Sequence, residues 1–180
     1  MTDPTFAAAQ ADMRHGYLDG APGVLVSGLV WLVAGVVAAA QSDTAGVWAL
    51  LGGGALIYPL SLVLTKALGR PGAHAEGNPL GRLAGETTVV LFAGLLVAVA
   101  VSVLRVAWFF PTMLLVIGGR YLMFQTVYGL RAYWALGAAL CAAGVALGVL
   151  LAPPFAGALA GAAIELVAGT ALWLRSRRPA

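Results

Sequence analysis

The chain has 180 residues, of which 61% are hydrophobic and 9% are charged, and its formal net charge is +3. Soluble domains carry about 25% charged residues, so most of the outer surface of this chain must contact lipid. The small net charge, without a long basic run, leads us to expect no nucleic-acid partner. The single cysteine, Cys141, excludes an intrachain disulfide and a CxxC metal or redox pair.

Residues 1–20 are expected to form a cytoplasmic segment that precedes the membrane-spanning part of the chain. Within this segment, 4–18 is predicted to be a short helix in the membrane interface, because Asp3 can cap it and Pro4 can start it. Its apolar face should bind the membrane surface. The residues expected on that face are Phe6, Met13 and Tyr17.

Six apolar stretches follow, each close to the ~20 residues that a helix needs to cross a hydrocarbon core of about 30 Å. Every backbone amide in hydrocarbon needs an internal partner, so these stretches must be helices despite their many glycines. The predicted spans are 22–40, 45–66, 84–104, 109–130, 133–152 and 155–174. We therefore expect an all-α fold, a polytopic bundle of six transmembrane helices over 21–175 with a short cytoplasmic tail at 176–180.

Positively charged residues predict the orientation, because they concentrate in cytoplasmic loops. With the N-terminus inside, eight Lys and Arg residues flank the spans on the cytoplasmic side and one lies on the outer side. The eight are Arg14, Lys66, Arg70, Arg82, Arg131, Arg175, Arg177 and Arg178, and the one is Arg105. We expect a multi-pass protein of the inner (plasma) membrane with both termini in the cytoplasm.

Arg120 is a charged residue about 16 Å into the fourth span, close to the bilayer midplane. An arginine at this depth costs at least ~2.5 kcal/mol and persists only with a partner or a water-filled cavity. Glu165 lies at nearly the same depth in the sixth span, on a stripe of glycines that favours close helix packing, and is the predicted partner. Glu86, nearer the cytoplasmic interface, is the second choice.

A polar and aromatic face continues from Arg120 along the fourth span, given 100° per residue. In the second span, Tyr58 precedes a proline that frees a backbone carbonyl in the inner half. Together these groups predict a polar pocket that opens inward. The alternative interpretation is an internal ion pair and hydrogen-bond network that fixes the helix positions. The candidate ligand-binding residues are Arg120, Glu86, Glu165, Tyr121, Gln125, Tyr128 and Tyr58.

Most enzyme templates do not fit this chain. His15 and His74 fall in cytoplasmic segments, so no predicted span carries a histidine base, haem ligand or zinc ligand. No motif of the HExxH, GxSxG or P-loop type is present. We expect no metal and no cofactor.

A family resemblance lies in four segments of the chain. They are YLDGAPGVLVSGLVWLVAG from Tyr17, YPLSLVLTKALGR from Tyr58, NPLGRLAGETT from Asn78 and WFFPTMLLVIGGRYLMFQTVYGLRAYWALG from Trp108. Nearly the whole chain resembles a family of small bacterial integral membrane proteins that is defined only as a domain of unknown function. The resemblance implies a multi-helix membrane fold and no assigned activity, and it assigns no site residue.

Three functional hypotheses remain for a protein whose main partner is the lipid bilayer. The first is small-solute binding or transport, in which Arg120 attracts an anionic group and Glu86 lines the inner mouth. The second is a non-catalytic scaffold or subunit, as a homo-oligomer or with a partner membrane protein, in which the Arg120–Glu165 pair is structural. The third and least favoured is a membrane enzyme that uses Glu86 or Glu165 as an acid or base.

Overall fold

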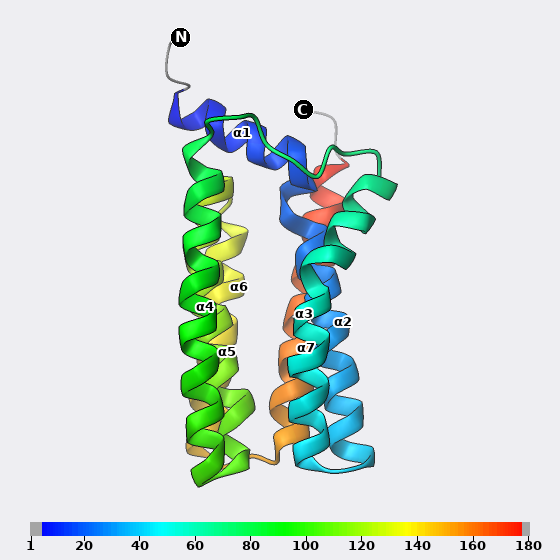
Figure 1. Cartoon of the computed structure of the whole chain (residues 1–180), viewed down its shortest axis with the longest axis vertical. Helices are drawn as coiled ribbons and strands as arrows, with labels where there is room; N and C mark the ends of the chain where they lie inside the picture. The colour runs from blue at the N-terminus through cyan, green and yellow to red at the C-terminus, as the bar shows by residue number, and fades with distance from the viewer. Residues whose placement is uncertain (1–4, 178–180) are drawn as a thin grey trace.

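The computed structural model describes residues 5–177, which form helices joined by short loops and contain no strand (Figure 1). The elements are α1 (Phe6–Tyr17), the 3-10 turn η1 (Leu18–Gly20), α2 (Ala21–Ala40), α3 (Asp43–Ala67), α4 (Pro79–Leu104), the 3-10 turn η2 (Val106–Trp108), α5 (Phe109–Tyr128), α6 (Ala132–Val149) and α7 (Pro154–Ser176). Six helical segments of the described chain are long and apolar enough to cross a membrane. The predicted all-α bundle with six spans is confirmed.

Helix α4 differs most from its predicted span, because it begins at Pro79 and not at residue 84. The Asn78 side chain accepts a hydrogen bond from the Leu80 N–H at 3.0 Å, and Pro79 takes the first helical position. The 26 residues of α4 extend about 39 Å, which exceeds the ~30 Å hydrocarbon core. The helix is therefore longer than the hydrocarbon core is thick.

The bundle consists of two three-helix units that stand side by side (Figure 1). Helix α2 packs mainly against α3 and α7, whereas α5 packs mainly against α4 and α6. Helix α7 also contacts α5 and α6, and we call this contact between the α2–α3–α7 unit and the α4–α5–α6 unit the seam. Helices α3 and α4 are consecutive in the chain but do not pack along each other.

Small residues let the helices of each unit approach closely. Gly161 of α7 packs against the indole of Trp31 on α2, and a Cβ atom there would lie 2.8 Å from the ring. Gly118 of α5 faces the backbone carbonyl of Gly137 on α6, which lies 2.8 Å from the position of such a Cβ. Close approach of this kind holds helices together in lipid, where apolar burial between helices contributes little. The glycine stripe expected on α7 is buried in this way.

Helix α1 lies across one end of the bundle, which we call the α1 end, and the C-terminal end of α7 lies there too (Figure 1). The Gln10 side chain donates to the Thr126 carbonyl at 2.8 Å. The Arg14 guanidinium donates to the Tyr128 carbonyl at 2.7 Å. These two hydrogen bonds tie α1 to the C-terminal end of α5.

The predicted helix is present, but its N-cap differs from the prediction. Thr5 is the N-cap and accepts a hydrogen bond from the Ala8 N–H at 3.3 Å, while Asp3 and Pro4 lie outside the described residues. Phe6 is 57% exposed, so it is not part of the buried face. The buried residues of α1 are Ala9, Met13 and Gly16. Helix α1 thus packs a face of mostly small residues against the ends of other helices, and the contact of its larger apolar side chains with the membrane surface stays a prediction.

The chain turns sharply between α1 and α2. Leu18, Asp19 and Gly20 have φ values of 52°, 56° and 80°, a region that residues with a Cβ atom rarely adopt. The Tyr133 hydroxyl of α6 donates to the Asp19 carbonyl at 2.7 Å and holds this corner in place. Packing across the bundle therefore maintains a strained backbone, which directs the chain from the α1 end into the first span.

We expect Gly20→Ala to lower the free energy of unfolding by about 1–3 kcal/mol, because it adds a Cβ atom to a residue with positive φ. That Cβ would also clash with the Tyr133 hydroxyl and lie tightly against the Tyr128 ring. The measurement is thermal unfolding of the purified protein in detergent. Gly23→Ala is the matched control, since a Cβ at Gly23 has no atom within 4 Å. Equal unfolding midpoints for the two variants would contradict the role of the corner.

Candidate polar site at the seam

Two ionisable residues lie at the same depth in the bundle. Arg120 and Glu165 are each the twelfth residue of their helices, α5 and α7, which both run toward the α1 end. At 1.5 Å per residue each lies about 17 Å from its helix start, near the middle of a ~30 Å core. The expectation that the two residues share one level agrees with these helix positions.

Arg120 is held by the hydroxyl groups of the neighbouring helix α4. Its Nε donates to Thr87 Oγ1 at 3.3 Å and its Nη2 donates to Thr88 Oγ1 at 3.0 Å. Both threonine hydroxyls donate their own proton to the Ala84 carbonyl, which leaves their lone pairs for the guanidinium. The guanidinium also lies 5.1 Å from the centroid of the Phe124 ring.

The predicted Arg120–Glu165 ion pair is wrong. The ion pair found among residues 5–177 joins Arg82 to Glu86, at 3.0 Å. Arg120 faces α4, whereas the next residue, Tyr121, points about 100° away around the helix and lies beside Glu165. The two residues share one level along the bundle, but the direction of the Arg120 side chain around α5 separates the two charges.

Glu165 is 0% exposed and lies where α2, α5 and α7 meet. The hydroxyls of Ser27 and Tyr121 lie beside its carboxylate, but neither reaches it with good hydrogen-bond geometry. Both carboxylate oxygens therefore lack a partner among the described residues. A buried carboxylate without a partner costs several kcal/mol when charged, so this position calls for a proton or a cation.

An aromatic cluster extends from this level toward the α1 end. Three of its residues come from α5 and one, Tyr133, comes from α6. The ring centroids lie 5.2 to 6.0 Å apart, and the rings of Tyr128 and Tyr133 stack at 16°. The members are Tyr121, Phe124, Tyr128 and Tyr133. Tyr121 and Tyr128 are buried, so the predicted face is largely packed against other rings.

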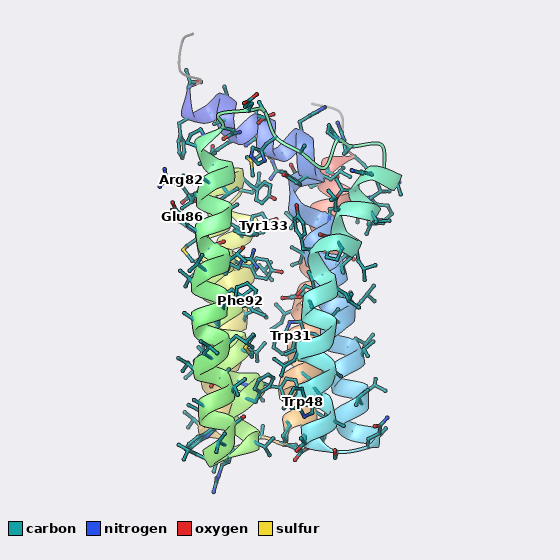
Figure 2. The ribbon with its side chains drawn as sticks, viewed as in Figure 1. Trp31, Trp48, Arg82, Glu86, Phe92 and Tyr133 are labelled. Carbon is teal, nitrogen blue, oxygen red and sulfur yellow. The ribbon has the colours of Figure 1, made fainter. Side chains whose placement is uncertain are left out.

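Three other predicted site residues do not contact the two charges. Glu86 and Arg82 lie on the outer side of α4, away from the α2–α3–α7 unit, and 58% of the Glu86 side chain is exposed (Figure 2). Tyr58 on α3 is 71% exposed. The prediction that Glu86 and Tyr58 line a pocket with Arg120 is wrong. Gln125 is half-buried, and its side chain makes no hydrogen bond to the described residues.

The prediction overlooked two groups that the structure brings to this site. Ser27 of α2 lies beside the buried carboxylate, and Tyr133 links the aromatic cluster to the strained corner. Ser27 could have been found from the sequence because it precedes Gly28, which lies on the α2 face that packs against α7. For Tyr133, an interfacial tyrosine gives no indication of a partner more than 100 residues away.

Within residues 5–177, no group of His, Cys, Asp and Glu residues could hold a metal ion. Neither of the two open cavities at the α1 end is lined by Arg120 or Glu165. The chemistry of the seam is therefore that of one cationic and one acidic side chain. The first can hold an anion, and the second can hold a proton or a small cation.

A double-mutant cycle tests whether the two charges are separate. We expect Arg120→Met and Glu165→Gln to be additive in unfolding free energy within about 0.5 kcal/mol, because the side chains share no contact. Arg120→Met and Thr88→Val are expected to be coupled by about 0.5–1 kcal/mol. The measurement is reversible unfolding in mixed micelles. Strong coupling of Arg120 to Glu165, together with none to Thr88, would show that the charges pair in solution.

Comparison with known proteins identifies one related group. A family model described as "Family of unknown function (DUF7010)" matches residues 6–175, from the start of α1 to the last turn of α7. No curated protein and no solved structure matches the chain. The expected resemblance to a family of unknown function is confirmed, and the chain belongs to the DUF7010 family.

Proposed function

We propose that this membrane protein binds and transports a small anionic solute together with a proton, at the seam between its two helix units. The observation that carries the proposal is the fully buried Glu165, whose two carboxylate oxygens have no partner among the described residues. Arg120 lies at the same depth and also has no carboxylate partner there. Intramembrane ionisable groups of this kind commonly mark solute and ion pathways.

The scaffold hypothesis explains this arrangement less well. A structural role is best served when buried opposite charges neutralise each other in good geometry. Arg120 instead faces α4, whereas Glu165 lies between α2 and α5. The groups beside the Glu165 carboxylate are the hydroxyls of Ser27 and Tyr121, which carry no positive charge to neutralise it.

Arg120 retains hydrogen-bonding capacity for a solute. Its Nε and Nη2 groups bind threonine hydroxyls, while Nη1 has no acceptor among the described residues. A guanidinium carries five N–H donors in a planar arrangement and forms strong charge-assisted bonds with carboxylate and sulfate-like groups. An anion at this edge would neutralise Arg120, and a proton or cation would neutralise Glu165.

The architecture offers a route for the movement that transport needs. Rocking of one helix bundle against another around a site at the midplane is a common form of alternating access. Here the two units meet mainly through α7, and α3 and α4 do not pack along each other. Movement of the units would change the access of both charged groups to the two sides of the membrane.

We also propose that the protein lies in the inner membrane of a bacterial cell with the α1 end in the cytoplasm. The support is the Lys and Arg distribution. Arg14, Arg70, Arg131 and Arg175 belong to segments at the α1 end, whereas Arg105 follows α4 at the opposite end.

Purified protein in liposomes that contain a trapped pH dye tests the proposal. The external probes are sulfate, glutamate and inorganic phosphate, which cross lipid poorly, and the inward concentration gradient of each probe supplies the driving force. We expect at least one probe to accelerate internal acidification. Arg120→Ala should reduce this rate about tenfold or more, as a charge-assisted contact of at least ~1.4 kcal/mol is lost. Glu165→Gln should abolish the proton movement.

Two variants serve as matched controls for this assay. Glu86→Gln removes a carboxylate on the outer side of α4, and Arg105→Ala removes an arginine at the opposite end of the bundle. Both are expected to keep the wild-type rate. Acidification no faster than in protein-free liposomes for all three probes, or wild-type rates in Glu165→Gln, would refute the proposed function.

A further inference from the structure

The α1 end contains an open cavity of about 530 Å³ that the transport proposal does not use. It lies between the C-terminal part of α1, the loop after α3 and the last turn of α7. A second open space of about 450 Å³ adjoins it and shares part of its lining. The lining residues of the first cavity are Arg14, His15, Leu18, Asp19, Arg70, Arg175 and Ser176.

The lining is strongly basic. Arg14, Arg70 and Arg175 supply three positive charges, and Asp19 supplies one negative charge, which leaves two net positive charges. Asp19 is only 8% exposed, and the charges of all three arginines act on its carboxylate. None of them forms a direct ion pair with it in the described part of the chain. The guanidinium groups are therefore gathered around a space and are not neutralised.

Most hydrogen-bond donors of this cluster remain available. Arg14 uses Nη1 for the Tyr128 carbonyl, and Arg70 uses Nη1 for His15 Nδ1 at 3.1 Å. A guanidinium has no acceptor, so His15 Nδ1 must accept, and the imidazole proton of a neutral ring then lies on Nε2 as a further donor. Arg175 makes no side-chain hydrogen bond to residues 5–177.

Backbone strain in the cavity lining is a second feature that is typical of ligand sites. Leu18 and Asp19 both have positive φ, although neither is glycine, and both line the cavity. Strain of this kind persists where the surrounding structure enforces it and is concentrated at ligand sites. Tyr133 holds this backbone in place, and the Asp19 carboxylate lies near enough to the three arginines for their charges to act on it.

The position of the cavity indicates what the ligand carries. Arg175 lies in the last turn of α7, two residues after Trp173, and an indole near a helix end typically lies at the membrane interface. The cavity is therefore at the depth of lipid phosphates. Planar guanidinium groups match the oxygen pairs of a phosphate, and basic pockets between helix ends bind anionic headgroups.

We propose that the cavity at the α1 end binds a phosphate group, carried either by an anionic lipid headgroup or by a soluble phosphate. Arg70 and Arg175 make the main contacts. Arg14 adds charge while it remains fixed to Tyr128, and the Asp19 carboxylate offsets one of the three positive charges. This site is separate from the seam and does not depend on the proposed transport.

Thermal unfolding of the full chain in nanodiscs tests this inference without any gradient. One arm adds inorganic phosphate to nanodiscs of phosphatidylcholine alone. The other arm uses nanodiscs that also contain phosphatidylglycerol. We expect a rise of a few degrees in the unfolding midpoint in at least one arm, as for a ligand at about ten times its Kd. A rise in the first arm identifies a soluble phosphate, and a rise confined to the second identifies a lipid headgroup.

The arginine variants separate this site from general charge attraction. Arg70→Gln combined with Arg175→Gln should lose the rise, whereas Arg131→Gln should keep it, because Arg131 lies at the same end but outside the cavity. If the double variant shows no unfolding transition of its own, Arg175→Gln alone replaces it. No rise in the wild type, an unchanged rise in the cavity variants, or an equal loss in Arg131→Gln would each overturn the inference.

Discussion

Helices in lipid gain little from burying apolar side chains against each other, because lipid chains are equally apolar, and their association depends on close approach and polar contacts. Helix α7 uses both on one face. Its glycines let it reach α2, and Glu165 on the same stripe brings a carboxylate to the point where α2, α5 and α7 meet. The packing of α7 on α2 and the position of the buried carboxylate therefore depend on the same stripe.

In the α4–α5–α6 unit, the charged residue Arg120 is held by neutral hydroxyl groups. Arg120 obtains its hydrogen bonds from threonine hydroxyls that already donate to the backbone of α4. This arrangement keeps an arginine in the bundle without a counter-charge, so its positive charge remains available to a solute. One unit thus contributes an uncompensated cation, held between two of its own helices, and the other contributes an uncompensated acid, which lies where the two units meet.

The six spans could be predicted from the sequence because hydrophobic length is a local property of the chain. The burial of Glu165 was also predictable, since the glycines spaced four residues apart mark the face that packs on another helix. The partner of Arg120 was not. Depth can be counted along a helix, but the order of helices around the bundle decides which neighbour a side chain meets. Glu86 and Thr87 are adjacent in sequence, and only the second faces α5.

The place of α7 in the chain has a consequence for biosynthesis. Helices α2 and α3 can pair soon after they leave the ribosome, and α4, α5 and α6 can then assemble as a second group. Ser27 and Tyr121 acquire their carboxylate neighbour only when the last span has inserted, more than 40 residues after Tyr121 has been synthesised. Before α7 has inserted, the α2–α3 pair and the α4–α5–α6 group are joined mainly by the loop after α3 and by α1. The site that contains Glu165 does not yet exist.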